Sequence, residues 1–477
     1  MPDRFKLIVL DDDPTGSQTV HSCPLLLRWD GASLRRGLAH PSPLLFVLAN
    51  TRALSAPAAS ERVREICRAL GLALAEAQAQ GLLDRWLIVS RGDSTLRGHF
   101  PLEVDQVSAD LGPFDATLLV PAFLPGGRTT VDGVHLLHGE PVHTTPFAAD
   151  RLFGFRNSHL PAWVEEKSGG RIPASAVSRI GLAELDAAAA CLAVLPPGPA
   201  SDGFQTLCQR LAGFSGNPVV AVDAQRPEQL EALGTAVWAL SGPEAAGRWG
   251  YPRRFLFQSA ASLLNGLVSL PPQPLDAAGL AALRRRSVAG DGAHEGCRPL
   301  PGLVLVGSHV PLADAQLAEL LQEPGCAGLE LPVAKVARVL EGPEPAALLA
   351  SLEVAWLEQL RARLAEGRTP VLFTSRGEIS CRSAAERIRL GLELAALMAR
   401  LAAALEPQLG YVISKGGITS HTLLADGLGL ASVELQGQLF AGLSLVLTPT
   451  GLPVVTFPGN LGEAGSLRQA WRLLEQG

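Results

Sequence analysis

The sequence predicts an α/β protein of two domains, each built on a mainly parallel sheet covered by helices. Three observations lead to this fold class. Short apolar runs alternate along the chain with longer Ala-, Leu-, Arg- and Glu-rich segments of helical period. The apolar runs are nearly continuous, which is typical of strands buried on both faces of a parallel sheet. The chain has 477 residues, more than one ordinary core accommodates.

The predicted strands fall into two sets. In the first half they are KLIVL at 6–10, PLLFVLAN at 43–50, RWLIVS at 85–90 and ATLLVPA at 116–122. In the second half they are GLVLVGS at 302–308, TPVLFTS at 369–375, GYVIS at 410–414 and LPVVTFPG at 452–459. Between the sets, a segment rich in Pro and Gly surrounds one short basic helix. We therefore expect domains at 1–270 and 302–477, joined by a linker at 271–301.

Composition narrows the class of function. The net charge of −6 provides no basic field for nucleic acid or for an anionic membrane. The seven cysteines are scattered and never form C-x-x-C, so neither a disulfide framework nor a zinc site is expected. No signal sequence is evident, and no apolar stretch approaches the ~20 residues that cross a bilayer. These features predict a soluble, cytoplasmic enzyme with no membrane or nucleic-acid partner.

The first predicted strand ends in three consecutive carboxylates, Asp11, Asp12 and Asp13. Like charges at the end of a buried strand repel one another and resist desolvation. A cation, a hydroxyl-rich ligand or solvent could each make use of them.

The strand at 85–90 ends in the same way, with Arg91, Asp93, Ser94 and Arg97. Ligands of open α/β sheets bind at this edge. Two arginines can hold a carboxylate by bidentate hydrogen bonds, while Asp and Ser can accept hydroxyl protons, so a polyhydroxy acid would satisfy all four. A simple turn with an internal Arg–Asp pair is an equally good interpretation of this stretch alone.

Other polar residues of the first half carry weaker signals. His135, His138 and His143 lack the spacing of a metal motif, so ordinary polar and turn roles are favoured. Lys167 could join an anion site or be solvated.

In the second half, four strand ends are followed by glycines or hydroxyl side chains and then by helical segments. Glycines let the backbone approach an anion closely, and helix starts offer unpaired amides. Several such ends on one sheet edge favour nucleotide binding. The Walker A pattern is absent, because Lys415 precedes its glycines instead of following them. The dinucleotide motif G-x-G-x-x-G is absent as well.

A rival hypothesis comes from the first strand end. Asp11, Asp13 and Thr15 fit the D-x-D-x-T motif of haloacid-dehalogenase-like phosphatases, with Asp11 as nucleophile and Asp13 as acid/base. Ser90 could serve as the later hydroxyl of that motif set. No acid pair follows a later strand, and the second half of the chain would then have no task.

Taken together, the motifs resemble those of the four-carbon acid sugar kinase family over nearly the whole chain. The shared stretches are DDPTGSQ, GDSTLRGH, PAFLPGGR…DGVH, EEKSGGRI and RRFLFQSAAS in the first half, and GSH, KGGITS and FPGNLG in the second. The resemblance implies an N-terminal sugar-acid domain, a C-terminal nucleotide domain, and an active-site cleft between them. Many members have Ala where Asp11 stands, which counts against the phosphatase.

The resemblance also implies an activity, its cofactors and its site. ATP with Mg²⁺ would phosphorylate a terminal hydroxyl of threonate, erythronate or 3-oxo-tetronate, with metal ligands unknown and a homodimer left open. Asp12 or Asp93 would act as the base. Substrate contacts are expected from Asp13, Arg91, Ser94, Arg97 and Lys167. Nucleotide contacts are expected from Ser308, His309, Ser375, Gly416, Gly417, Ile418, Thr419, Gly459, Asn460 and Gly462.

Two departures from the family pattern concern the substrate and the nucleotide. Arg91 stands where members often have Lys, and Ile418 replaces the acid of G-G-[DE]-T. The loss of that acid supports a third hypothesis, a non-catalytic sensor that binds sugar acid and nucleotide without transfer.

Overall fold

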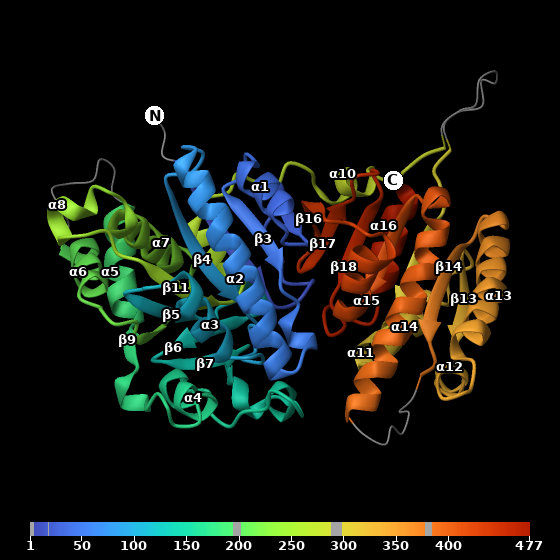
Figure 1. Cartoon of the computed structure of the whole chain (residues 1–477), viewed down its shortest axis with the longest axis horizontal. Helices are drawn as coiled ribbons and strands as arrows, with labels where there is room; N and C mark the ends of the chain where they lie inside the picture. The colour runs from blue at the N-terminus through green and yellow to red at the C-terminus, as the bar shows by residue number, and fades with distance from the viewer. Residues whose placement is uncertain (1–3, 18, 194–201, 288–297, 377–383) are drawn as a thin grey trace. The chain divides into compact units, whose positions relative to one another are not determined.

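The computed structural model describes residues 4–17, 19–193, 202–287, 298–376 and 384–477 (Figure 1). Within these ranges the chain forms two compact units, Met1–Pro272 and Gln273–Gly477. Both contain a mainly parallel sheet flanked by helices, so the predicted α/β class is confirmed.

The sheet of the N-terminal unit is parallel throughout its described pairings. All four strands predicted in this half are present; among the described residues, three further short strands extend the sheet at its sides, and a fourth lies between two of the predicted strands. In sheet order the strands are β2 (Cys23–Leu26), β3 (Leu44–Leu48), β1 (Phe5–Asp11), β4 (Arg85–Arg91), β11 (Phe255–Ser259), β5 (Ala116–Val120), β10 (Val219–Val222) and β9 (Ser178–Ile180).

Helices cover this sheet because each has one apolar stripe. One hydrophobic cluster joins alternate strand residues such as Ile8, Leu45 and Ile88 to buried side chains of the first helices, which are α1 (Gly31–Ala39), α2 (Ala56–Ala79), α3 (Leu102–Leu111) and α4 (Leu160–Lys167). A second group packs around α7. It contains α5 (Leu182–Leu192), α6 (Asp202–Ala212), α7 (Pro227–Ser241), α8 (Ala245–Trp249) and α9 (Ser262–Leu267).

A small antiparallel sheet follows β5. Its strands are β6 (Arg128–Val131), β7 (Val134–Leu137) and β8 (Glu140–Pro141). The side chain of His135 on β7 is fully buried, and its Nε2 lies 2.8 Å from the carbonyl oxygen of Ser94. The small sheet thereby supports the loop that follows β4.

The C-terminal unit has a parallel sheet with an antiparallel extension. The parallel strands, in sheet order, are β13 (Cys326–Leu331), β14 (Thr369–Thr374), β12 (Gly302–Val306), β15 (Tyr411–Lys415) and β18 (Pro453–Phe457). All four strands predicted in this half are among them. The antiparallel strands are β17 (Leu443–Leu447) and β16 (Ser432–Phe440). Side chains of β16 alternate between buried and partly exposed, as one-sided packing requires.

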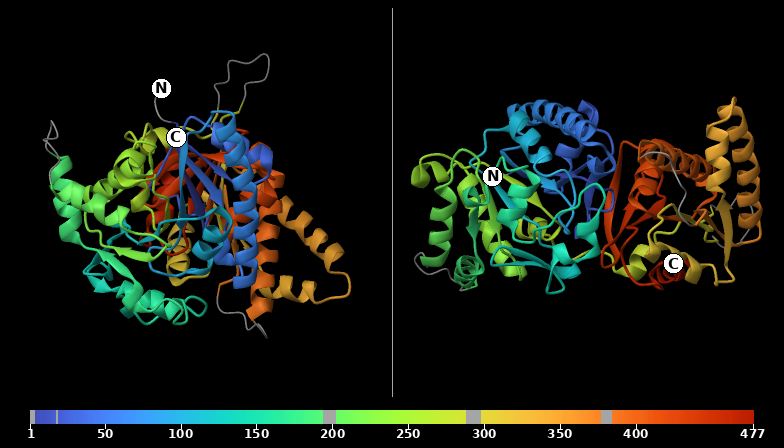
Figure 2. Two further views of the ribbon diagram at one scale, coloured as in Figure 1. Left: turned by 60° about the vertical axis from the view of Figure 1, so that its left-hand side comes forward. Right: turned by 90° about the horizontal axis from the view of Figure 1, so that it is seen from below.

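Helices of this unit also pack on its sheet. One hydrophobic cluster joins Val304, Ile413 and Val455 to α10 (Ala277–Ala281), α11 (Pro311–Leu320) and α16 (Ser466–Gln476). Helix α13 (Pro345–Ala365) packs on β14 and on α12 (Val333–Leu340), and the two form the orange pair in Figures 1 and 2. The remaining helices are α14 (Ala384–Leu405) and α15 (Gly417–Thr422).

The segment 271–301 was predicted as a linker, and its role as one stays a prediction. Its residues 288–297 lie outside the described part of the chain. Of the rest, Leu280 and Ala281 belong to the core of the C-terminal unit, and Arg284 Nε donates to the carbonyl oxygen of Leu300 at 2.8 Å. Among the described helices, none combines the length and the apolarity that a membrane span requires.

Candidate active site

The N-terminal site forms where neighbouring parallel strands end. Strand β1 lies between β3 and β4, with Asp11 in register with both Leu48 and Arg91. The chain beyond each strand therefore emerges at one edge of the sheet, which is the ligand-binding edge of open α/β sheets. This is the edge at which the sequence predicts a ligand beside Arg91, Asp93, Ser94 and Arg97.

Asp12 is held by an arginine that the sequence prediction did not include. Arg52 Nε and Nη2 donate to the two carboxylate oxygens of Asp12 at 3.0 and 2.5 Å, and Arg52 Nη1 lies 3.4 Å from Asp13 Oδ2. Burial raises the pKa of Asp12 and Arg52 opposes that rise. For Asp13, burial also favours the protonated form, but Arg52 and the hydrogen bonds from Thr15 outweigh it and lower the pKa.

Asp11 lies deeper than its neighbours. It is 1% exposed, Arg91 Nη1 lies 3.6 Å from its Oδ1, and burial raises its pKa to about 7. Gly16 is packed so closely that a Cβ there would lie 2.0 Å from Asp11 Oδ1. A nucleophile must reach its substrate, so this enclosure disfavours the phosphatase hypothesis.

Asp93 and Arg97 form a second ion pair at the end of β4. Arg97 Nε donates to Asp93 Oδ2 at 2.7 Å, and the Thr95 hydroxyl donates to the same oxygen. Burial would raise the pKa of Asp93, but the charges of Arg52 and Arg97 with these hydrogen bonds lower it well below its usual range. Asp93 therefore stays ionised at every physiological pH.

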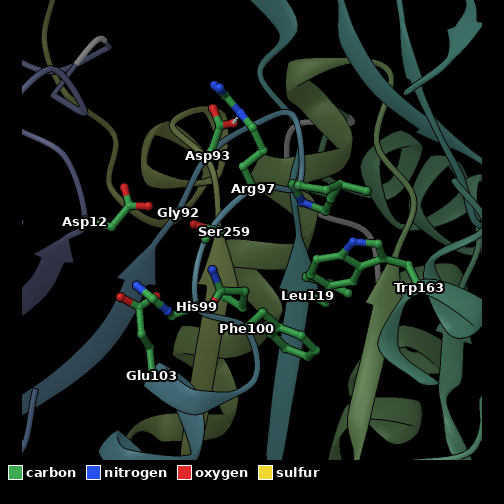
Figure 3. Close-up of a pocket in the computed structure, with 14 residues that line it drawn as sticks. Asp12, Gly92, Asp93, Arg97, His99, Phe100, Glu103, Leu119, Trp163 and Ser259 are labelled. Atoms are coloured by element: carbon green, nitrogen blue, oxygen red, sulfur yellow. Dashed lines mark hydrogen bonds and ion pairs between the residues drawn. The ribbon is translucent and has the colours of Figure 1, made fainter. Parts of the chain in front are cut away.

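A pocket opens between these two ion pairs (Figure 3). In this view Asp12 and Glu103 lie on one side, Asp93 with Arg97 above, and Trp163 on the other side. Its lining residues are Asp12, Gly92, Asp93, Leu96, Arg97, Gly98, His99, Phe100, Glu103, Leu119, Pro121, Trp163, Gln258 and Ser259. Carboxylates, a guanidinium and aromatic rings thus face one small space, as a short polyhydroxy acid would require.

Glu103 is a further acid of the pocket that the sequence prediction missed. It lies in the first turn of α3, is 5% exposed, and accepts a hydrogen bond from the Thr51 hydroxyl. Burial, and then the charge of Asp12, raise its pKa to about 7. It therefore exchanges its proton in the physiological range.

The structure brings some of the predicted substrate residues to the pocket and not others. Asp12, Asp93 and Arg97 line it, whereas Asp13, Arg91, Ser94 and Lys167 do not. Arg91 is 4% exposed and lies against Asp11 and Asp12. Lys167 Nζ lies 3.4 Å from the carbonyl oxygen of Phe153.

The signal for Arg52 and Glu103 in the sequence is slight. Arg52 follows the predicted strand at 43–50 by two residues, and strand-end position alone could have suggested it. Gln258 and Ser259 fall in the quoted RRFLFQSAAS motif but were given no role.

In the C-terminal unit, all four predicted strand ends converge, since Arg376 Nη1 after β14 donates to the Ser308 carbonyl oxygen at 2.5 Å. A Cβ on Gly416 would lie 3.4 Å from the Ser308 nitrogen and 3.2 Å from Thr419 Oγ1, and one on Gly459 would lie 2.4 Å from Ser308 Oγ. Gly416 has a φ of 122°, which favours glycine. The turns after β12, β15 and β18 thus form one cradle whose backbone approaches closely, which fits a phosphate group.

The other predicted nucleotide residues differ in their surroundings. His309 Nε2 lies 3.2 Å from Thr374 Oγ1 at the end of β14. Ser375 Oγ donates to Glu330 at 2.5 Å, so its hydroxyl is directed to β13. Ile418 is 43% exposed. Asn460 is exposed, and a Cβ on Gly462 would lie 2.6 Å from Ser466 Oγ.

Comparisons with known proteins agree with this division of the chain. Residues 7–267 match the family model of a sugar-binding N-terminal domain, and residues 303–467 match that of a nucleotide-binding C-terminal domain. Fold and matches thus define a two-domain α/β protein whose domains match a sugar-binding and a nucleotide-binding family. The chain belongs to the four-carbon acid sugar kinase family, as the resemblance predicted.

The similarity to curated relatives and to a solved structure covers most of the chain. A D-threonate kinase of Bordetella bronchiseptica is 27% identical over 80% of this chain and 77% of its own length. A D-threonate kinase of Cupriavidus necator is 28% identical over 80% and 79%. A solved structure from Salmonella typhimurium LT2 matches with a TM-score of 0.62 and 17% identity, covering 98% of this chain and 99% of that one, which supports the fold.

Proposed function

We propose that this chain is an ATP-dependent kinase that phosphorylates a terminal hydroxyl of a four-carbon sugar acid such as threonate, erythronate or 3-oxo-tetronate. The observation that carries the proposal is the pairing of an acid- and arginine-lined pocket in the sugar-binding unit with a glycine cradle in the nucleotide-binding unit. The D-threonate kinases among the relatives support the substrate class.

In the pocket, we assign the substrate carboxylate to Arg97. Its guanidinium is 19% exposed, so it can reach a ligand while Asp93 fixes its orientation. Arg91 was predicted to share this task, and that role stays a prediction, since its described ion pairs are with Asp11 and Asp12.

Asp12 is the better candidate for the base that accepts the hydroxyl proton. Both Asp12 and Asp93 line the pocket, but their proton affinities differ because burial raises the pKa of Asp12 whereas Arg52 and Arg97 lower that of Asp93. A general base works best with a pKa near the working pH. Asp93 is then left to orient the substrate.

The cradle of the C-terminal unit suits ATP, because its glycine turns bring backbone atoms and the Ser308 and Thr419 hydroxyls close together, and such groups can donate to phosphate oxygens. Ser308, Gly416, Thr419 and Gly459 would hold the phosphates, and neutralised charge is the main requirement of phosphoryl transfer. The described residues contain no group of three or more side chains that could hold a metal ion. We therefore expect Mg²⁺ to arrive with the nucleotide, where it would neutralise charge on the phosphates.

The test is ADP formation from Mg-ATP with D- and L-threonate, erythronate, their 3-oxo forms and longer sugar acids, against a blank without acceptor. Acceptor-dependent ADP is expected, with Asp12→Asn and Asp93→Asn lowering turnover far more than ATP affinity. Asp132→Asn is the matched control, since Asp132 is 94% exposed in the same unit.

Three results would contradict the proposal. Unchanged turnover in both Asp12→Asn and Asp93→Asn would contradict the roles of Asp12 as base and of Asp93 in orienting the substrate. ATP binding without ADP formation on any acceptor would favour the sensor. Release of phosphate from sugar phosphates, abolished by Asp11→Asn, would favour the phosphatase.

A further inference from the structure

Lys415 is a fully buried lysine at the end of β15. Its relative exposure is 0%, and it immediately precedes the glycine turn of the nucleotide cradle. Lysine is almost never found fully buried unless it is paired with an opposite charge. Its position therefore calls for a physical reason.

The described contacts of the Lys415 ammonium are with neutral groups. Its Nζ donates to the carbonyl oxygen of Pro458 at 2.9 Å and lies 3.9 Å from the centre of the Phe457 ring. The flanking strands β12 and β18 carry no ionisable residue, and α15 carries His421. His309 and Arg376 lie beyond the ends of β12 and β14, and Asp314 pairs with Arg376 at 2.9 Å. No carboxylate among the described residues is recorded beside Lys415.

Lys415 also joins the turns that form the cradle. Its carbonyl oxygen accepts from the Gly307 nitrogen at 3.2 Å, and the Gly416 nitrogen donates to the Phe457 carbonyl oxygen at 2.9 Å. Together with the bond from Nζ to Pro458, these contacts connect the ends of β12, β15 and β18 through Lys415 and Gly416. The Nζ bond is the one of the three that depends on the side chain.

We propose that Lys415 is a positioning residue of the nucleotide site: its buried ammonium fixes the two glycine turns and supplies a positive charge that bound phosphates neutralise. The inference rests on the proposed binding of nucleotide to this unit. A buried cation without an anion is costly in the unliganded protein, and a polyanion bound at the adjacent turns offsets that cost. The cradle thus gains affinity at the expense of stability.

Protonation provides a signature of this role. Burial lowers the pKa of Lys415 to about 7, so above that pH the unliganded protein holds it largely neutral. Phosphates at the cradle would favour the charged form and raise its pKa. Nucleotide binding at pH 8 should therefore take up a proton from solution.

The experiment is calorimetry of Mg-ADP binding at pH 6 and pH 8 in buffers of different ionisation enthalpy, with thermal unfolding of the unliganded protein. In the wild type we expect proton uptake at pH 8 and little at pH 6. Lys415→Met should lose that uptake and bind about tenfold more weakly at pH 6, while its unliganded stability stays equal or rises. Lys335→Met, at an exposed position on α12, is the matched control and should behave as the wild type.

The outcomes separate this inference from the proposed function. Absence of Mg-ADP binding by the wild type would contradict the nucleotide site itself. Wild-type binding without proton uptake at pH 8 would overturn the role of Lys415, and that measurement needs no variant. Loss of stability together with affinity in Lys415→Met would indicate a purely structural lysine and would also overturn it.

Discussion

Replacing Arg52 by Met tests whether this arginine compensates the charge of the buried acids at the end of the first strand and so stabilises the fold. Arg52 is 18% exposed, and its partner Asp12 is 3% exposed with both oxygens engaged. Removing one member of a buried ion pair costs about 3–5 kcal/mol, because the other charge is left without compensation. Since Arg52 keeps some contact with water, we expect the lower end, about 3 kcal/mol.

The assay is thermal unfolding of the N-terminal unit, where about 3 kcal/mol corresponds to a fall in Tm of roughly 6–12 °C. Arg35→Met is the control, because Arg35 pairs with Glu76 on the surface at 3.4 Å, with side-chain exposures of 56% and 43%. An exposed pair contributes about 0–1 kcal/mol.

The pH dependence of the deficit identifies its cause. Without Arg52 the pKa of Asp12 in the folded state lies further above its unfolded value, so the native form of the variant binds protons more tightly. The destabilisation is then present at neutral pH and decreases as falling pH protonates the carboxylate. An Arg52→Met deficit no larger than that of Arg35→Met, or one that grows as pH falls from 8 to 5, would refute this reasoning.

Three further predictions concern the same two sites. Gly16→Ala should cost about 1–3 kcal/mol by crowding Asp11, and unfolding of the Asp11→Ala/Gly16→Ala double variant should show most of that loss restored. Gly459→Ala should leave Tm unchanged, because Ser308 can rotate, yet weaken Mg-ADP binding measured by calorimetry. The raised pKa of Glu103, about 7, means that the folded form binds the extra proton, so stability falls as pH rises from about 4.5 to 7. Tm in Glu103→Gln should therefore fall less over that interval, and equal slopes would contradict this.

Much of the fold was predictable because it depends on local pattern. Continuous apolar runs gave all eight predicted strands, and the polar residues after them marked the edge of each sheet at which the candidate sites lie. Some of the strands that the sequence did not reveal are short, such as β9 and β10 with three and four residues, and β16 alternates between its two faces. Short strands carry too little periodicity to stand out from loops.

The partners within the site were harder to predict because they depend on distant residues. Asp12 and Arg52 are 40 positions apart, and Thr51 and Glu103 are 52 apart. Glu103 lies in the first turn of α3, where acidic residues are common because they stabilise the start of a helix. Its local sequence therefore looks like that of an ordinary surface acid. Only the strand order, which places β1 between β3 and β4, brings these side chains together.

This dependence on distant partners decides the chemistry of the pocket as well as its composition. From the sequence, Asp12 and Asp93 are equivalent, since each is an aspartate at the end of a parallel strand. In the structure Asp93 has two cations and a hydroxyl stabilising its charge, whereas burial dominates at Asp12. A carboxylate that is strongly stabilised as an anion is a weak base, but it still accepts hydrogen bonds from hydroxyl groups and can orient them. The choice of Asp12 as base therefore follows from the positions of Arg52 and Arg97, and not from the motifs that contain the two acids.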